Sequence, residues 1–204
     1  MSFVGIFRTK NGLAALADSK ASIMENGRLV EETDRHPEKM FCFDHGLAVT
    51  YGANQIFLDN QTRVFSSRVN IEDLVREYLA SRNNLDSSFF QSLLLKISST
   101  PANKEPVNFI IGRKIWDGNF TLEHHQVGCN YYVEKLATSK DHYFTGGDEL
   151  YKKAFDRMDL ISRITDVDLL RKTAASRLME LIEFYDGILA YNSVGGPVKS
   201  FVLK

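Results

Sequence analysis

The sequence predicts an α+β fold in which stacked β-sheets are covered by helices. Segments with strand character and segments with helix character come in blocks: strands, two helices, more strands, two more helices and a final strand. Residues 13–17 (Leu-Ala-Ala-Leu-Ala) are apolar at every position, which is typical of a strand covered on both faces. With 204 residues and no internal repeat, the chain is expected to form one domain, residues 1–204.

The chain opens on two predicted strands joined by a tight turn. Residues 2–9 are rich in β-branched and aromatic side chains, and Lys10-Asn11-Gly12 supplies the turn because Asn-Gly tolerates positive φ. Further along, the sequence predicts a turn at 25–27, strands at 28–30, 39–43 and 46–51, a polar loop over 31–38 and the start of a loop or helix at 52–54.

Apolar side chains at helical spacing mark the two helix pairs. Asn70 is expected to be an N-cap whose side chain accepts from the first-turn amides, and a second helix begins at about Asp86. Asp148 is expected to cap a third helix, and the longest helix runs over about 166–184, with Leu150 and Leu169 among the inward-facing residues. The other predictions are strands at 107–111, 119–124, 130–137, 142–145 and 198–203, a break at 146–147 and a loop over 187–196.

The composition argues against several classes of function. A formal net charge of −1 creates no global field for nucleic acid or for an anionic membrane surface. The chain shows no secretory signal and no apolar stretch long enough to span a membrane, so a cytoplasmic protein is expected. Cys42 and Cys129 are interpreted as small buried thiols. His124 and His125 are neighbours on a strand and point to opposite faces, so neither a metal nor any cofactor is expected.

Ser2 is the first candidate for chemistry. If Met1 is removed, which the small side chain of serine favours, Ser2 carries a free α-amine beside its hydroxyl, and such an amine can act as the base for its own side chain. The structural alternatives remain open at this point. Ser2 would then be an ordinary residue at the start of a strand, Asp18 would cap a turn, and Lys39 would be a solvated lysine on an edge strand.

Three segments, taken in order, resemble the proteasome-like branch of the N-terminal nucleophile (Ntn) hydrolases. These are residues 13–22 (LAALADSKAS), residues 39–43 (KMFCF) with the following GLAV and GA, and residues 194–203 (VGGPVKSFVL). The resemblance covers nearly the whole chain. It implies a four-layer αββα sandwich like that of a proteasome β subunit.

The resemblance also implies the roles of four residues. Ser2 falls on the mature N-terminal nucleophile, Asp18 on the aspartate after the second strand, and Lys39 on the active-site lysine. Gly52 falls on the glycine whose amide contributes to the oxyanion hole. The residue types suit this chemistry: a nearby cation lowers the pKa of the nucleophile, a carboxylate holds that cation, and an amide stabilises the oxyanion.

The chain departs from the family pattern at three points. Serine replaces the usual threonine at position 2. The Gly-Ser-Gly turn falls on Thr145-Gly146-Gly147, so the serine that would contact the terminal amine is missing, with Thr145 or a water as substitutes. Asp186 and Ser193 are the nearest candidates for the family's late aspartate and serine.

The resemblance leads to two hypotheses about function. In the first, the protein is a proteasome-like hydrolase, a protease or amidase, that cleaves a peptide or small amide substrate and forms a homo-oligomer. In the second, it is a catalytically inactive relative that acts as an assembly or binding module. The sequence identifies no ATPase partner, and neither nucleic acid nor a membrane is an expected partner.

Overall fold

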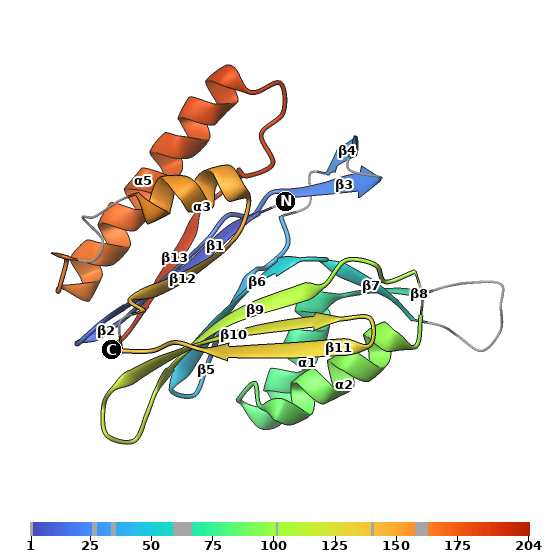
Figure 1. The fold of residues 1–204 in the computed structure, drawn as a ribbon, viewed down its shortest axis with the longest axis horizontal. Helices are drawn as coiled ribbons and strands as arrows, with labels where there is room; N and C mark the ends of the chain where they lie inside the picture. The colour runs from blue at the N-terminus through green and yellow to red at the C-terminus, as the bar shows by residue number, and fades with distance from the viewer. Residues whose placement is uncertain are drawn as a thin grey trace.

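The computed structural model describes residues 2–25, 28–33, 36–58, 67–100, 102–139, 141–157 and 163–204. Two antiparallel sheets organise this part of the chain (Figure 1). The four-stranded sheet has the order β12 (Tyr143–Gly147), β1 (Phe3–Thr9), β2 (Gly12–Ala17), β13 (Lys199–Leu203). The five-stranded sheet has the order β11 (Tyr131–Leu136), β10 (Phe120–Gly128), β9 (Val107–Lys114), β6 (Gly46–Gly52), β5 (Met40–Phe43).

Strand β2 is buried on both faces, as its apolar run predicts. It lies between β1 and β13, and all six of its residues are buried. Ala14 and Leu16 pack on one side with the helices α3 (Glu149–Asp156) and α5 (Val167–Ile188). Residues of the alternate set, Leu13 and Ala15 among them, pack on the other side against the five-stranded sheet. The prediction for this strand is therefore confirmed.

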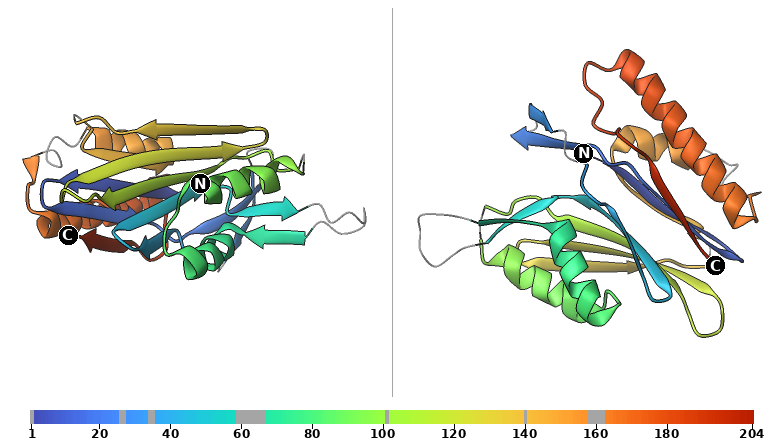
Figure 2. Two further views of the ribbon diagram at one scale, coloured as in Figure 1. Left: turned by 90° about the horizontal axis from the view of Figure 1, so that it is seen from below. Right: turned by 180° about the vertical axis from the view of Figure 1, so that it is seen from behind.

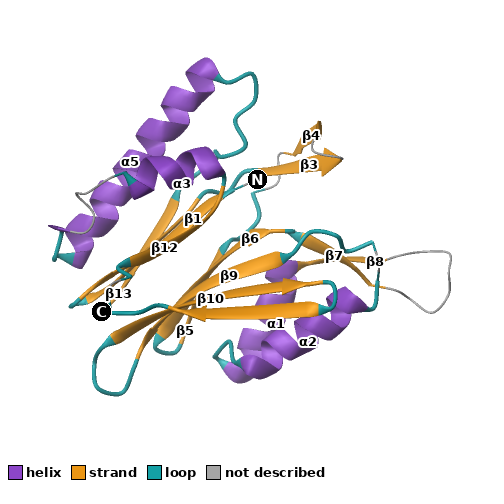
Figure 3. Cartoon of the chain, viewed as in Figure 1, coloured by secondary structure: helices purple, strands orange, loops and turns teal. Residues whose placement is uncertain are grey.

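The five-stranded sheet carries the second helix pair, α1 (Ile71–Arg82) and α2 (Ser87–Ser98). Phe89 and Phe90 of α2 meet Phe109 of β9 edge to face, with ring centroids 5.5 and 5.4 Å apart. Figures 1 and 3 show the two helix pairs on opposite sides of the molecule with both sheets between them. The view from behind in Figure 2 shows the same arrangement, with the N-terminus at the end where the sheets diverge. The prediction of a mixed fold of helices and antiparallel sheets is confirmed.

Of the two predicted helix caps, Asp148 forms as expected and Asn70 does not. Asp86 and Asp166, predicted only as approximate helix starts, also cap the helices that follow them, and Asp86 accepts from the amides of Ser88 and Phe89. Asn70 does occupy the N-cap position of α1, but its side chain makes no capping bond. Its Oδ1, the atom that would accept from those amides, accepts from Gln55 Nε2 (2.8 Å), and its Nδ2 donates to Asp73 Oδ2 (2.6 Å). Side-chain partners have replaced the backbone amides that the prediction assigned to Asn70.

Some element boundaries differ from the sequence-based expectations. A hairpin of β7 (Gln55–Leu58) and β8 (Ser67–Asn70) follows Gly52 where a loop or helix was expected. A second hairpin, β3 (Ala21–Glu25) with β4 (Arg28–Thr33), extends into the predicted loop over 31–38. In the second hairpin, pairing with β3 overrides the polar composition of the last residues of β4. The turn residues Asn26 and Gly27 lie outside the described residues.

Three glycines that were expected to interrupt a strand or helix lie inside regular elements. Strand β12 continues through Gly146 and Gly147 because these residues pair with Val4 and Phe3 of β1. Helix α5 includes Gly187 and ends only at Ile188, where the Leu189 amide bonds to the Tyr185 carbonyl. The cross-strand partner and the continuing helical hydrogen bonds outweigh the low propensity of glycine.

Three side chains expected to be buried are exposed instead. Leu150 and Leu169 are 46% and 54% exposed, because each faces outward from the first turn of its helix. Cys42 is also exposed, and Cys129 is half-buried. Cys42 lies on the edge strand β5 and alternates with Phe41 and Phe43, which take the face packed against the helices.

Candidate active site around Ser2

Three of the predicted site residues gather where β1 begins. Ser2 directly precedes β1, Asp18 directly follows β2, and the antiparallel register that pairs Val4 with Ala17 brings both to the same end of the sheet. Lys39 directly precedes β5 in the other sheet. Ser2, Asp18 and Lys39 are 3%, 1% and 1% exposed, and a lysine buried to this extent needs a compensating charge.

Asp18 supplies that charge and connects several segments of the chain. Its Oδ1 accepts from Lys39 Nζ at 2.8 Å and from the Phe3 amide at 2.9 Å. Its Oδ2 accepts from the Gly195 amide at 3.2 Å. Lys39 Nζ also donates to the carbonyl of Lys20 at 2.8 Å. Asp18 therefore fixes the backbone next to Ser2, orients Lys39 and anchors the Gly-Gly turn at residues 195–196.

Burial and pairing act in opposite directions on these two charges. Burial raises the pKa of the Asp18 carboxyl, whereas the contact with Lys39 and the two backbone amides favour its ionised form. Burial lowers the pKa of Lys39, and the carboxylate of Asp18 counteracts that effect. The result is a lysine that gives up its proton more readily than a solvated lysine does. Asp18 bonds both this lysine and the amide of Phe3, the residue that follows Ser2.

Ser193 also reaches this site, through Asp148. The Ser193 hydroxyl donates to Asp148 Oδ2 at 2.6 Å, and the Asp148 amide donates to the carbonyl oxygen of Ser2 at 2.7 Å. Sequence reasoning identified Asp148 only as the cap of a helix, which is also correct. Its place opposite Ser2 follows from the pairing of β1 with β12, for which the local sequence holds no signal.

Thr145, one predicted substitute for the missing turn serine, lies opposite Gly5 rather than beside Ser2. Thr145 pairs with Gly5, and its methyl group lies on the face of β12 turned toward that glycine. Gly146 faces the other sheet, where a Cβ atom would overlap the ring of Tyr51. Gly147 has φ +105°, and a Cβ there would overlap the Ser2 carbonyl oxygen, so this close approach requires glycine.

Asp186 lies near the end of α5, away from Ser2. Its Oδ1 accepts from Asn192 Nδ2 at 2.9 Å, and Asn192 Oδ1 accepts from the buried Tyr151 hydroxyl at 3.0 Å. Asp186 therefore supports the loop that carries Ser193, and the structure brings only Ser193 of these two candidates to the site.

Gly52 ends strand β6 with φ +91°. The Thr50 amide donates to the Lys39 carbonyl at 2.9 Å, and Gly52 lies two residues further, about 7 Å along the strand. Its near neighbours are Pro106 and Asn108. Gly52 thus lies at the same end of β6 as Thr50, which bonds the backbone of Lys39. Among the described residues, no contact joins Gly52 to Ser2.

Tyr51 and His124 are two neighbouring residues that the sequence did not single out together. The Tyr51 hydroxyl lies 2.8 Å from His124 Nε2, and the two rings stack at 6.0 Å. Burial and the nearby Glu149 raise the pKa of Tyr51 to about 12, and burial lowers the pKa of His124. The Tyr51 ring of this pair occupies the space in front of Gly146, on the face of the sheet that Val4 also faces.

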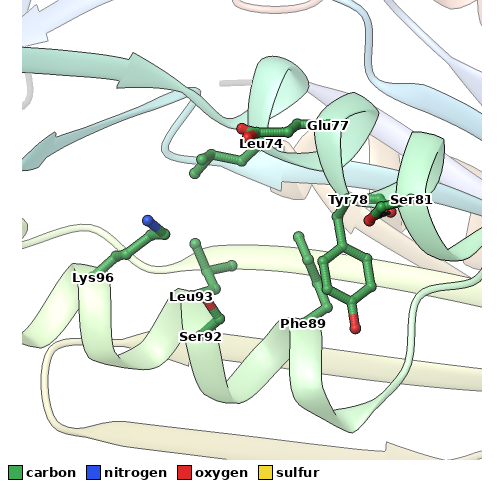
Figure 4. Close-up of a pocket in the computed structure, with 8 residues that line it drawn as sticks. All are labelled: Leu74, Glu77, Tyr78, Ser81, Phe89, Ser92, Leu93 and Lys96. Atoms are coloured by element: carbon green, nitrogen blue, oxygen red, sulfur yellow. Dashed lines mark hydrogen bonds between the residues drawn. The ribbon is translucent and has the colours of Figure 1, made fainter.

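Two surface hollows lie outside this cluster. One, of about 270 Å³, lies between α1 and α2 (Figure 4), and the Tyr78 hydroxyl at its wall is already bonded to Asp86 (2.7 Å). The other, of about 350 Å³, lies between α5 and residues 196–198. Neither is lined by Ser2, Asp18 or Lys39. Among the described residues, no group of three His, Cys, Asp or Glu side chains could hold a metal, and no helix is long and apolar enough to cross a membrane.

Comparison with known proteins yields similarity in structure alone. No family model matches the sequence, and no curated protein matches it. Thiobacillus denitrificans BPH, solved in complex with epoxomicin, is similar over 99% of this chain and 98% of its own, with a TM-score of 0.55 and 17% identity. The Gly-1 mutant of Anbu from Hyphomicrobium sp. strain MC1 is similar over 100% of this chain and 82% of its own, with a TM-score of 0.51 and 16% identity.

These structural neighbours are proteasome-like proteins. The chain therefore has a proteasome-like fold. The buried cluster of Ser2, Asp18 and Lys39 lies at the end of the four-stranded sheet where β1 begins and β2 ends. Structural similarity at 16–17% identity shows the fold alone, so any catalytic function has to be argued from the residues of this chain.

Proposed function

We propose that this protein is an Ntn hydrolase that cleaves a peptide or amide bond with Ser2 as its nucleophile. The observation that carries the proposal is the buried Asp18, which bonds both the Phe3 amide and Lys39 Nζ and so holds a cation beside Ser2. The two sheets with a helix pair outside each support a single domain arranged as a four-layer αββα sandwich.

The proposed reaction has two halves. The Ser2 α-amine takes the proton of the Ser2 hydroxyl while Oγ attacks the carbonyl carbon of the substrate, and the oxyanion accepts a hydrogen bond from the Gly52 amide. The leaving amine then takes the proton, the C–N bond breaks, and an ester remains on Ser2. Water hydrolyses this ester with the same amine as base. Lys39 favours the neutral amine and the ionised hydroxyl through its charge, and Asp18 keeps Lys39 in place.

Removal of Met1 is part of the proposal, because only then is the Ser2 nitrogen an amine. Met1 lies outside the described residues. An amide nitrogen cannot act as a base, so protein that retains Met1 is expected to be inactive. The intact mass of untagged protein reports directly whether Met1 is present.

Covalent labelling tests the proposal. Met1-free protein, made by cutting an N-terminal fusion directly before Ser2, is incubated with epoxomicin, the ligand of the BPH structure, and separately with an activated ester. Mass spectrometry of the N-terminal peptide is expected to show a Ser2 adduct in the wild type and in Ser2→Thr. Ser2→Ala and protein that retains Met1 should stay unlabelled. If neither reagent produces an adduct that depends on the Ser2 hydroxyl, the hydrolase proposal is wrong.

The second candidate function is an inactive assembly or binding module of the same fold. One observation favours it: position 146 has no side chain, and the Tyr51 ring fills the space in front of it. A homo-oligomer is proposed for both candidates, and light scattering measures its size. A large ring without any Ser2 adduct would favour the module, whereas a labelled protein of any size favours the hydrolase.

A further inference from the structure

A second carboxylate-bearing residue holds Ser2 from the β12 side of β1, which is opposite to β2 and Asp18. The Asp148 amide bonds the Ser2 carbonyl oxygen at 2.7 Å. Covalent geometry places the Ser2 nitrogen within about 4 Å of that same oxygen. The nitrogen of Ser2 and the backbone of Asp148 are therefore neighbours across the β1–β12 pair, in line with the register that places Phe3 opposite Gly147.

Each oxygen of the Asp148 carboxylate accepts one hydrogen bond. Its Oδ1 accepts from the Leu150 amide at 2.9 Å and so caps α3, and its Oδ2 accepts from the Ser193 hydroxyl at 2.6 Å. Ser193 is 5% exposed and precedes the segment whose Gly195 amide bonds Asp18. Asp18 and Asp148 thus clamp the same two segments, the start of β1 and the loop over 193–195, from two sides.

We propose that Asp148 and Ser193 act as a positioning pair for the α-amine of Ser2, in the place where the related pattern has a turn serine. Asp148 holds the backbone of Ser2 and presents a negative charge to the amine, and Ser193 sets the strength of that charge by its hydrogen bond. The inference rests on the proposed function, because the amine exists only after Met1 is removed.

The charge balance around Ser2 gives this pair a distinct signature. Besides Asp18, Lys39 and Asp148, the titratable side chains on the described segments near Ser2 include Lys20, His36, Tyr51, Glu149 and Tyr151. Lys39 disfavours a protonated amine, and Asp148 favours it. Loss of the Asp148 charge should therefore make the amine less basic. Loss of the Ser193 hydroxyl leaves the carboxylate less neutralised and should make the amine more basic.

The test measures the proton affinity of the amine itself. Met1-free protein is treated with a trace of an amine-acylating reagent over a range of pH, and the modified N-terminal peptide is quantified by mass spectrometry. The midpoint is expected to fall by about one pH unit in Asp148→Asn and to rise by about half a unit in Ser193→Ala. Asparagine can still cap α3, so the fold should tolerate the first change.

Asp166→Asn is the matched control. Asp166 caps α5 as Asp148 caps α3, but the adjacent Val167 packs against Gly12, at the far end of the β1–β2 hairpin from Ser2. This variant loses an equivalent capping charge and is expected to leave the midpoint unchanged. Circular dichroism and the melting temperature of each variant verify that it is folded.

The outcomes separate this inference from the proposed hydrolase activity. Shifts of opposite sign support the positioning pair even if epoxomicin never labels Ser2, in which case only the hydrolase proposal fails. Unchanged midpoints, or shifts of the same sign in both variants, overturn the positioning pair even if Ser2 is labelled. If Asp148→Asn does not fold, Ser193→Ala decides alone: an upward shift supports the pair, and no shift or a downward shift refutes it.

Discussion

Replacing Lys39 with methionine is the sharpest test of how the Ser2 end of the fold is held together. The change keeps most of the side-chain volume but removes the cation bonded to Asp18 at 2.8 Å. The two side chains are 1% and 0% exposed, so water cannot take the place of the missing partner. Asp18 would then retain a buried charge with only the Phe3 and Gly195 amides as donors.

Removing one partner of a buried ion pair destabilises a protein by about 3–5 kcal/mol. For a domain of 204 residues, a loss of that size lowers the melting temperature by about 10 °C. Urea unfolding followed by circular dichroism measures the free energy of unfolding, and the slope with urea should stay unchanged if the variant folds normally. The double variant Asp18→Asn with Lys39→Met removes the unpaired charge as well, so it should recover at least half of the loss.

Arg76→Met is the control, because it removes an ion pair that is exposed to solvent rather than buried. Arg76 bonds Glu38 at 2.6 Å, but the two side chains are 57% and 30% exposed, and a solvated pair contributes about 1 kcal/mol or less. If Lys39→Met costs no more than Arg76→Met, the buried pair does not hold this end of the fold and the reasoning about Asp18 is wrong.

Two further predictions concern Gly147 and His124. Gly147→Ala should destabilise the protein by about 3 kcal/mol or more, because a side chain there combines a positive φ with overlap at the Ser2 carbonyl oxygen. Gly118→Ala is the control: its φ is +84° but the space around it is open, so it should cost only about 1 kcal/mol. Equal losses of unfolding free energy in urea would contradict the close approach of Gly147 to Ser2. Burial lowers the pKa of His124 in the folded protein, so the unfolded chain binds a proton more readily. The folded state therefore has its full stability above the ordinary pKa of histidine and loses stability as the pH falls below that value. His124→Phe should therefore lose less stability than the wild type between pH 7 and pH 5, and parallel pH profiles would argue against a buried neutral histidine.

Local sequence patterns predicted most elements where the pattern has a direct physical cause. The apolar run of β2 could be placed because only two-sided burial suits such a run. Asp148 marked a helix start because a carboxylate satisfies the first free amides, and apolar spacing placed the starts near Asp86 and Asp166. The hairpin of β7 and β8 was missed, since its strands gain their stability from pairing rather than from apolar periodicity.

The sequence by itself determined which residues bear chemistry at the start of the chain: Ser2 after Met1, Asp18 at the end of the second strand, and Lys39 before the next strand pair. Only the tertiary structure decided that Asp18 and Lys39 form a buried pair, that Asp148 faces Ser2, and that Asp186 does not. Asp18 and the Gly195 amide that it binds are 177 positions apart. Contacts at that separation depend on the register of β1 with β12 and of β2 with β13, which the packing of whole sheets sets and no local pattern encodes.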